Sequence, residues 1–157
     1  MIHLPDIRQG GSWDCGLVAA RVVLGAHRKR LTPPIRAALG SDPVDGTDPR
    51  AMETAFRLAG LGVISGEMTL ADLAHQTIQG RPVVCLVTWS TVGHYVVVQA
   101  VKADRIHIQD PEDGPTTVSV RTLEKGWRDL HRLGAVYRSW GIATWPMARR
   151  RIVRPTG

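Results

Sequence analysis

The chain changes character near its middle, and this change limits the folds that it can adopt. Before residue 80, apolar residues recur at helical spacing between capping residues, which predicts helices at about 13–27, 32–39, 47–60 and 69–78. After residue 80, short apolar runs predict strands at about 82–88, 94–101, 105–109, 116–120 and 139–145, with one more helix over 122–130. Residues 62–66 fit a short edge strand. Helices followed by an antiparallel sheet predict an α+β fold.

The length of 157 residues is enough for one compact domain with a real core and too short for two. We expect one domain over residues 1–146 and a basic, flexible tail over residues 147–157. No apolar run approaches the ~20 residues that span a bilayer, and the N-terminus lacks the pattern of a secretory signal. A cytoplasmic location is the default expectation, although export by another route leaves no such mark.

The two cysteines do not suggest a disulfide or a metal site. Cys85 lies in the apolar segment Pro82–Thr88, which is typical of a buried and inert thiol. Two cysteines cannot form a four-thiolate zinc site, and the six histidines include no close pair at ligand spacing. We therefore expect neither a metal nor a cofactor.

The formal net charge of +6 is concentrated in two runs, residues 27–30 and 149–151. A positive surface can bind nucleic acid, an anionic membrane or an anionic cell-wall polymer. No aromatic residues alternate with these charges as a stacking platform for bases would require, so nucleic acid is not the favoured partner. The simpler interpretation is that the two runs are a solvated helix end and a basic tail. An anionic polymer is a candidate contact of the tail.

The segment Gln9–Leu17, which reads Gln-Gly-Gly-Ser-Trp-Asp-Cys-Gly-Leu, carries the most informative chemistry. It places Cys15 just before an apolar helical run, where the positive end of the helix dipole favours thiolate over thiol. The thiolate is the nucleophile of cysteine catalysis. Asp14 fits either the N-cap of this helix or a substrate contact, and Trp13 fits the wall of a substrate cleft.

A nucleophilic cysteine needs a base, a group that orients the base, and donors for the oxyanion. His94 begins one predicted strand and Asp110 ends the next, nine residues before and seven residues after residue 103 in the turn that joins them. We therefore expect the two side chains to be neighbours, with the aspartate fixing the histidine tautomer. Gln9 lies six residues before Cys15, and its amide could stabilise an oxyanion together with the Cys15 N–H.

Each of these residues alone has a simpler interpretation: a packing cysteine, a surface histidine, a turn aspartate and a solvated glutamine. The ordered set, with each member at the end of a predicted element, favours a nucleophilic site instead.

At these residues the chain resembles the papain-like cysteine peptidases of the bacteriocin-processing, double-glycine type, peptidase family C39. The matching residues are Gln9, Asp14-Cys15-Gly16, His94-Tyr95-Val96 and Asp110-Pro111, in the family's order, and the resemblance covers about residues 3–145. It implies a papain-like fold with N-terminal helices packed on a C-terminal sheet. It also implies Cys15 as nucleophile, His94 as base, Asp110 as orienting group and Gln9 as oxyanion donor.

Such domains usually sit at the N-terminus of a membrane transporter, whereas this sequence contains no membrane segment, so we expect a stand-alone domain. The favoured function is a cysteine endopeptidase acting on a peptide or protein, and the resemblance implies a leader-type peptide as a candidate substrate. Two alternatives stay open: a hydrolase of peptidoglycan stem peptides that uses the same residues, and a non-catalytic papain-fold module in a larger assembly.

Overall fold

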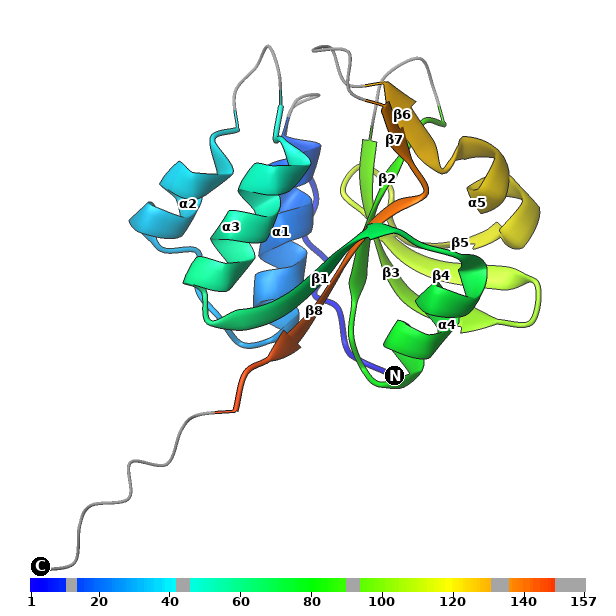
Figure 1. Ribbon diagram of the computed structural model, residues 1–157, viewed down its shortest axis with the longest axis horizontal. Helices are drawn as coiled ribbons and strands as arrows, with labels where there is room; N and C mark the ends of the chain where they lie inside the picture. Colours follow the sequence, from blue (N-terminus) through cyan, green and yellow to red (C-terminus); the bar gives the residue numbers. More distant parts are fainter. Residues whose placement is uncertain (11–13, 42–45, 90–93, 131–135, 149–157) are drawn as a thin grey trace, which may run out of the picture.

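The protein is built around one six-stranded antiparallel sheet (Figure 1). The structure is a computed structural model, and it describes residues 1–10, 14–41, 46–89, 94–130 and 136–148. The strand order across the sheet is β1-β8-β2-β3-β4-β5. The strands are β1 (Leu61–Glu67), β2 (Val83–Val87), β3 (His94–Lys102), β4 (Arg105–Asp110), β5 (Gly114–Ser119) and β8 (Trp140–Pro146). Helices and an antiparallel sheet together confirm the predicted α+β class.

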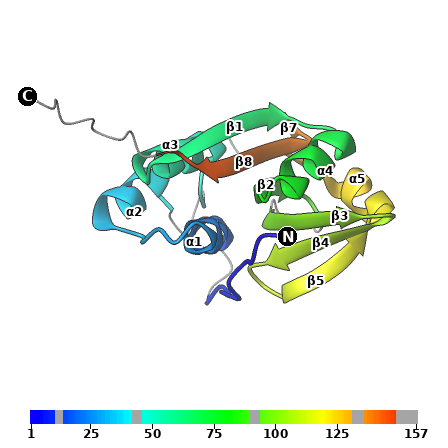
Figure 2. The same ribbon diagram turned by 90° about the horizontal axis from the view of Figure 1, so that it is seen from below.

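Helices cover the sheet on both faces (Figure 2). The helices α1 (Cys15–Ala26), α2 (Pro33–Leu39) and α3 (Pro49–Leu58) share one apolar core with the sheet. The helices α4 (Leu70–Ile78) and α5 (Val120–Gly126) contribute to a second core on the other face. Proline begins α2 and α3, and a capping box of Thr69 and Asp72 begins α4.

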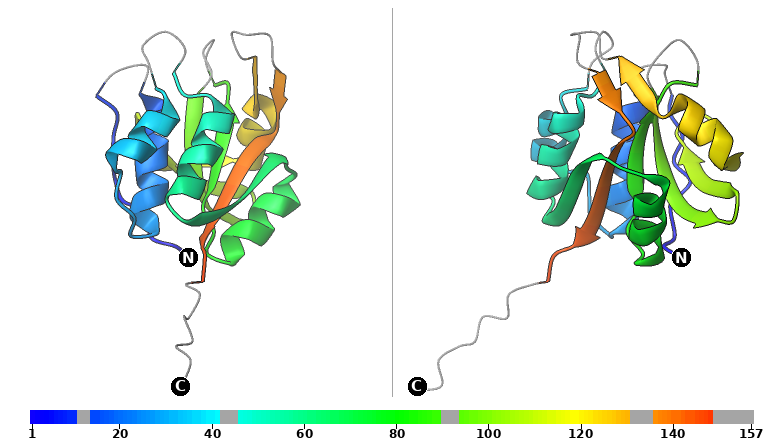
Figure 3. Two further views of the ribbon diagram at one scale, coloured as in Figure 1. Left: turned by 60° about the vertical axis from the view of Figure 1, so that its left-hand side comes forward. Right: turned by 45° about the vertical axis from the view of Figure 1, so that its right-hand side comes forward.

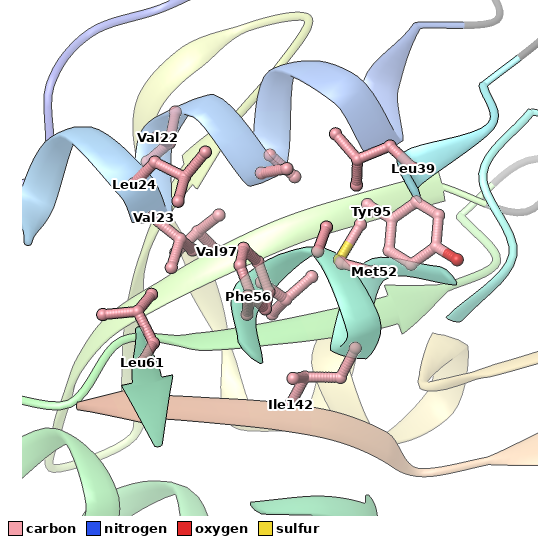
Figure 4. Packing of buried hydrophobic residues seen from close by; sticks show 14 of the residues in the cluster. Val22, Val23, Leu24, Leu39, Met52, Phe56, Leu61, Tyr95, Val97 and Ile142 are labelled. Carbon is pink, nitrogen blue, oxygen red and sulfur yellow. The ribbon is translucent and has the colours of Figure 1, made fainter. Parts of the chain in front are cut away.

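Helix α1 is the central helix of the first core. Its buried residues are Gly16, Val18, Ala19, Ala20, Val22, Val23 and Leu24. Those from Ala19 to Leu24 pack with Met52 and Phe56 of α3 and with Tyr95 and Val97 of β3 (Figure 4). A helix that is apolar on most of its surface is held by packing on several sides, which fixes the position of its first residue.

The starts of α1 and β3 lie at the same end of the molecule (Figure 3). The first residue of α1 is Cys15 and the first residue of β3 is His94. The topology therefore brings together two residues that are far apart in the sequence.

The predicted helix over residues 122–130 is wrong in its second half. Helix α5 begins earlier, where the Ser119 hydroxyl caps the Thr122 N–H, and it ends at Gly126. Beyond it, β6 (Arg128–Leu130) pairs with β7 (Val136–Arg138) in a separate two-stranded sheet. Gly126 lies against Trp89, where an added Cβ would stand 2.4 Å from the Trp89 ring.

Some expectations lie outside the described residues. These are the tail from residue 149 onward and the place of Trp13. Strand β8 ends at Pro146, and Met147 after it is exposed. In the described part of the chain, every helix is too short or too polar to cross a membrane.

Candidate active site

Cys15 is the first residue of α1 and is half-buried. Asp14 occupies the N-cap position, as one of its two interpretations predicted, although its side chain makes no capping hydrogen bond with the helix. Its Oδ2 atom instead accepts a hydrogen bond of 3.2 Å from the backbone N–H of Gly10. The carboxylate therefore ties the segment before the cysteine to the start of the helix.

Gly16 is needed for the close packing behind Cys15. A Cβ at this position would lie 2.5 Å from the Thr47 Cβ and 3.2 Å from the Tyr95 ring. Tyr95 is buried, and its hydroxyl donates a hydrogen bond of 2.6 Å to the Thr47 carbonyl. The residue after the cysteine and the residue after His94 thus pack against the same partner, which sets the distance between α1 and β3.

His94 and Asp110 are neighbours, as the predicted hairpin required. The His94 Nε2 atom donates to Asp110 Oδ1 over 2.9 Å, with the side chains 18% and 6% exposed. The same oxygen accepts from the backbone N–H groups of Glu112 at 2.8 Å and Asp113 at 3.4 Å. Asp110 is therefore held by the turn that follows β4 as well as by the histidine.

The imidazole of His94 also forms a hydrogen bond with the Cys15 side chain. Burial alone lowers the pKa of His94, but the hydrogen bonds with Asp110 and Cys15 outweigh it and raise the pKa to about 10. For Asp110, burial raises the pKa, and the bonds from His94 and Glu112 reverse this, so its pKa lies below the ordinary value. Both shifts favour a protonated His94 beside a carboxylate.

The choice of ring nitrogen has a chemical consequence. Because Nε2 is directed at Asp110, Nδ1 is the nitrogen left to face Cys15. Asp110 can then hold the ring while the opposite nitrogen faces the thiol. A thiol, an imidazole and a carboxylate in this order can perform acyl transfer.

Gln9 lies in the segment that precedes the cysteine and is half-buried. Its backbone N–H donates a hydrogen bond of 2.6 Å to the carbonyl of Pro111, the residue after Asp110. With the contact between Gly10 and Asp14, this places Gln9 between the end of β4 and the start of α1. Trp13 lies outside the described residues, so its predicted place in a substrate cleft stays a prediction.

Cys85 takes no part in this site. It is fully buried in β2, and burial raises the pKa of its thiol far above the ordinary value. The prediction that this thiol is buried is confirmed. Among the described residues, no group of three histidine, cysteine or carboxylate side chains is arranged to hold a metal ion.

Sequence reasoning missed two contacts beside this site. One is the bond between Tyr95 and the Thr47 carbonyl, and the other joins the Gln109 side chain to Asp6. Both connect residues far apart in the sequence, at 48 and 103 positions, so no local pattern could have indicated them.

Comparison with known proteins agrees with this geometry. A model described as the peptidase C39 family matches residues 3–131, and no curated protein matches the chain. The structure is similar to a double glycine motif protease from an AMS/PCAT transporter in complex with the leader peptide. The TM-score is 0.70 at 17% identity, covering 93% of this chain and 94% of the other.

Two further structures have the same fold. The peptidase domain of Streptococcus ComA has a TM-score of 0.68 at 18% identity, covering 92% of this chain and 100% of the other. A putative C39-like peptidase from Bacillus anthracis has a TM-score of 0.70 at 12% identity, with 95% and 98% coverage. The family match spans most of the sequence and the fold agrees with it. The chain therefore belongs to the peptidase C39 family and is a cysteine peptidase.

Proposed function

We propose that the chain is an endopeptidase in which Cys15 is the nucleophile, His94 the general acid and base, and Asp110 the orienting group. The observation that carries the proposal is the 2.9 Å hydrogen bond from His94 Nε2 to Asp110 Oδ1, on an imidazole that also bonds the Cys15 side chain. A raised pKa for His94 supports a protonated imidazole beside Cys15 before substrate binds.

In the acylation half of the reaction, the Cys15 sulfur attacks the carbonyl carbon of the peptide bond. The carbonyl oxygen becomes an oxyanion, which the Cys15 N–H and the Gln9 side-chain amide stabilise. The tetrahedral intermediate then collapses as His94 Nδ1 gives its proton to the leaving amine. The C–N bond breaks, the amine product leaves, and the acyl group remains on Cys15 as a thioester.

In the deacylation half, the now neutral His94 takes a proton from a water molecule. The resulting hydroxide attacks the thioester carbonyl, and the C–S bond breaks. The acid product leaves, and the enzyme returns to the paired thiolate and imidazolium. Asp110 keeps its charge throughout, because its part is to hold the ring and to stabilise the imidazolium.

A leader-type peptide with two glycines before the scissile bond is the proposed substrate. One protein of the same fold is a double glycine motif protease found in complex with its leader peptide. Glycine has no Cβ, which lets the peptide backbone approach closely to a nucleophile at a helix start. The half-buried position of Cys15 favours such a slender substrate over one with bulky side chains at the cleaved bond.

A labelling experiment tests the nucleophile. Iodoacetamide is added to the native protein in a substoichiometric amount, and peptide mass spectrometry then measures the alkylation of each cysteine. Cys15 should react first, and Cys85, fully buried with a raised pKa, is the internal control. Alkylation of Cys15 no faster than Cys85 would contradict the proposal.

A cleavage experiment tests the rest of the site. The substrate is a peptide ending in Gly-Gly linked to a fluorogenic amine, compared with the same peptide carrying Val-Val. Cys15→Ala should abolish cleavage, and His94→Gln should lower kcat by about 10²–10⁴-fold, the usual contribution of general acid–base catalysis. His107→Gln on β4, also half-buried, is the matched control and should keep full activity.

Other outcomes would identify the alternatives. Loss of turbidity in a suspension of purified cell walls, without cleavage of either peptide, would favour a peptidoglycan hydrolase with the same residues. If Cys15 labels no faster than Cys85 and no product forms, a non-catalytic module would be favoured.

A further inference from the structure

The N-terminal segment runs between α1 and strands β3 to β5 without forming regular structure of its own (Figure 2). Its first contact with the sheet is a hydrogen bond of 2.8 Å from the Gln99 side chain to the Ile2 carbonyl. On the side of α1, Pro5 packs against Gly25, where an added Cβ would lie 2.9 Å from the proline ring. Contacts on both sides therefore fix the position of the segment before Gln9.

Asp6 makes the side-chain contact that joins this segment to the strand of Asp110. Gln109, the residue before Asp110 in β4, is 2% exposed, and its Nε2 atom donates to Asp6 Oδ1 over 3.0 Å. A buried amide that loses its acceptor is costly. Asp6 thus satisfies a buried group of the strand that carries a site residue.

Arg8 holds the same carboxylate from the other side. Its Nε and Nη2 atoms lie 3.2 Å and 3.4 Å from the two carboxylate oxygens of Asp6. The guanidinium also packs over Gly114 at the start of β5, where an added Cβ would lie 2.6 Å from Nη2. Hydrogen bonds from Arg8 and Gln109 both lower the pKa of Asp6. The two partners fix the direction of the carboxylate.

The next residue along the chain is Gln9, whose backbone N–H donates to the Pro111 carbonyl over 2.6 Å. Two successive contacts therefore attach the segment to the end of β4. The contact of Asp6 is made to the residue before Asp110, and the contact of Gln9 is made to the residue after it.

We propose that Asp6 is a positioning residue that holds Gln9 in register with Asp110, by bridging the buried Gln109 amide and the Arg8 guanidinium. The inference rests on the proposed role of Gln9 as an oxyanion donor. Asp6 acts through geometry, because an exposed ion pair such as that of Asp6 and Arg8 contributes little to stability by itself. An oxyanion donor, by contrast, loses its effect when it is displaced by about 1 Å.

Kinetics of the fluorogenic Gly-Gly peptide test the inference. Asp6→Ala should lower kcat by about tenfold or more and leave KM within about twofold, since an oxyanion donor acts in the transition state. Asp6→Asn keeps an acceptor for Gln109 and should recover most of the loss. Asp104→Ala, an exposed aspartate in the turn between β3 and β4, is the matched control and should behave as the unaltered protein.

The decisive kinetic comparison uses the Gln9→Ala background. If Asp6 works through Gln9, Asp6→Ala should have no further effect on kcat once the Gln9 side chain is gone. Equal losses in both backgrounds would overturn the inference and assign Asp6 a general structural role.

Hydrogen exchange provides a readout that needs no turnover. In Asp6→Ala, the backbone N–H of Gln9, which donates to the Pro111 carbonyl, should exchange about tenfold or more faster. The exchange rates of backbone N–H groups at the centre of β3 should be unchanged. An unchanged rate at Gln9 would overturn the inference. Failure of Cys15 labelling or peptide cleavage would instead count against the proposed function, so the two failures are distinguishable.

Discussion

Replacing Asp110 with asparagine should change the titration of His94 in a direction and size that follow from the site. Asparagine keeps an oxygen that can accept from Nε2, so the ring stays in place, but the negative charge is lost. An opposite charge at this distance typically raises a histidine pKa by about 1–3 pH units. We therefore expect the pKa of His94 to fall from about 10 by that amount, with the contribution of Cys15 remaining.

NMR is the assay, following the ring carbon and proton signals of His94 as the pH is raised. The signal is assigned by its absence in His94→Gln, and the other five histidines are internal controls. An unchanged His94 midpoint in Asp110→Asn would refute the argument that the carboxylate holds the proton on the ring.

The same pair makes a prediction for stability. The pKa of His94 is raised in the folded state, so its stabilising contribution is complete below pH 6.5 and is lost as the pH rises towards 10. The pKa of Asp110 is lowered, so its contribution is present above pH 3.8 and is lost as the pH falls below that value. Asp110→Asn should therefore cost most between pH 3.8 and pH 6.5, by about 1.4–4 kcal/mol for 1–3 pH units. Urea unfolding at several pH values measures it, and a pH-independent difference would contradict the linkage.

Three further changes should lower stability to urea. Gly16→Ala should lower the free energy of unfolding by about 1–3 kcal/mol, because the added methyl group overpacks against Thr47. This is opposite to the usual stabilising effect of alanine in a helix. Adding Thr47→Gly to the same chain should recover part of the loss. Tyr95→Phe leaves the buried Thr47 carbonyl without its donor and should cost about 1–3 kcal/mol. Thr69→Ala removes half of the capping box of α4 and should cost about 1 kcal/mol. Asp104→Ala is the common control, and a variant as stable as this control would contradict its own prediction.

Much of the local structure could be predicted because its signals lie within a few residues of one another. The capping box of Thr69 and Asp72, the proline at the start of α3 and the turn between β3 and β4 all belong to this kind. The sequence also contains the order of the site residues, each at the end of an element. These signals place Cys15 and His94 at element ends, and the fold brings the ends together.

The parts that could not be predicted depend on pairing between distant segments. Strand β8 was expected as a strand, but nothing local shows that it lies between β1 and β2. Residues 128–130 become a strand only because residues 136–138 are available as partners. In both cases tertiary pairing determines the outcome, and intrinsic propensity has little part in it.

The hairpin that joins His94 to Asp110 shows what a count of residues from the turn can predict and what it cannot. Near the turn, Val101 pairs with Ile106, and a regular ladder from there would place Asp110 opposite Val97. Val97 points towards α1, whereas Val96 points to the other face of the sheet. Because side chains alternate along a strand, His94 shares the face of Val96. A regular hairpin would therefore have put His94 and Asp110 on opposite faces of the sheet.

A β-bulge at Gln99 corrects this. The register shifts by one residue between Val98 and Ala100, so Val97 pairs with Gln109, and Asp110 comes opposite Val96, on the face of His94. Asp110 is then diagonal to His94, within reach of a long side chain. The same bulge leaves the Gln99 side chain bonded to the Ile2 carbonyl, at the start of the segment that leads to Gln9. One extra residue in β3 thus brings the histidine and the aspartate together and also anchors the segment that carries Gln9. The hairpin count predicted that the two residues would be neighbours, but it contained no sign of the bulge on which their common face depends.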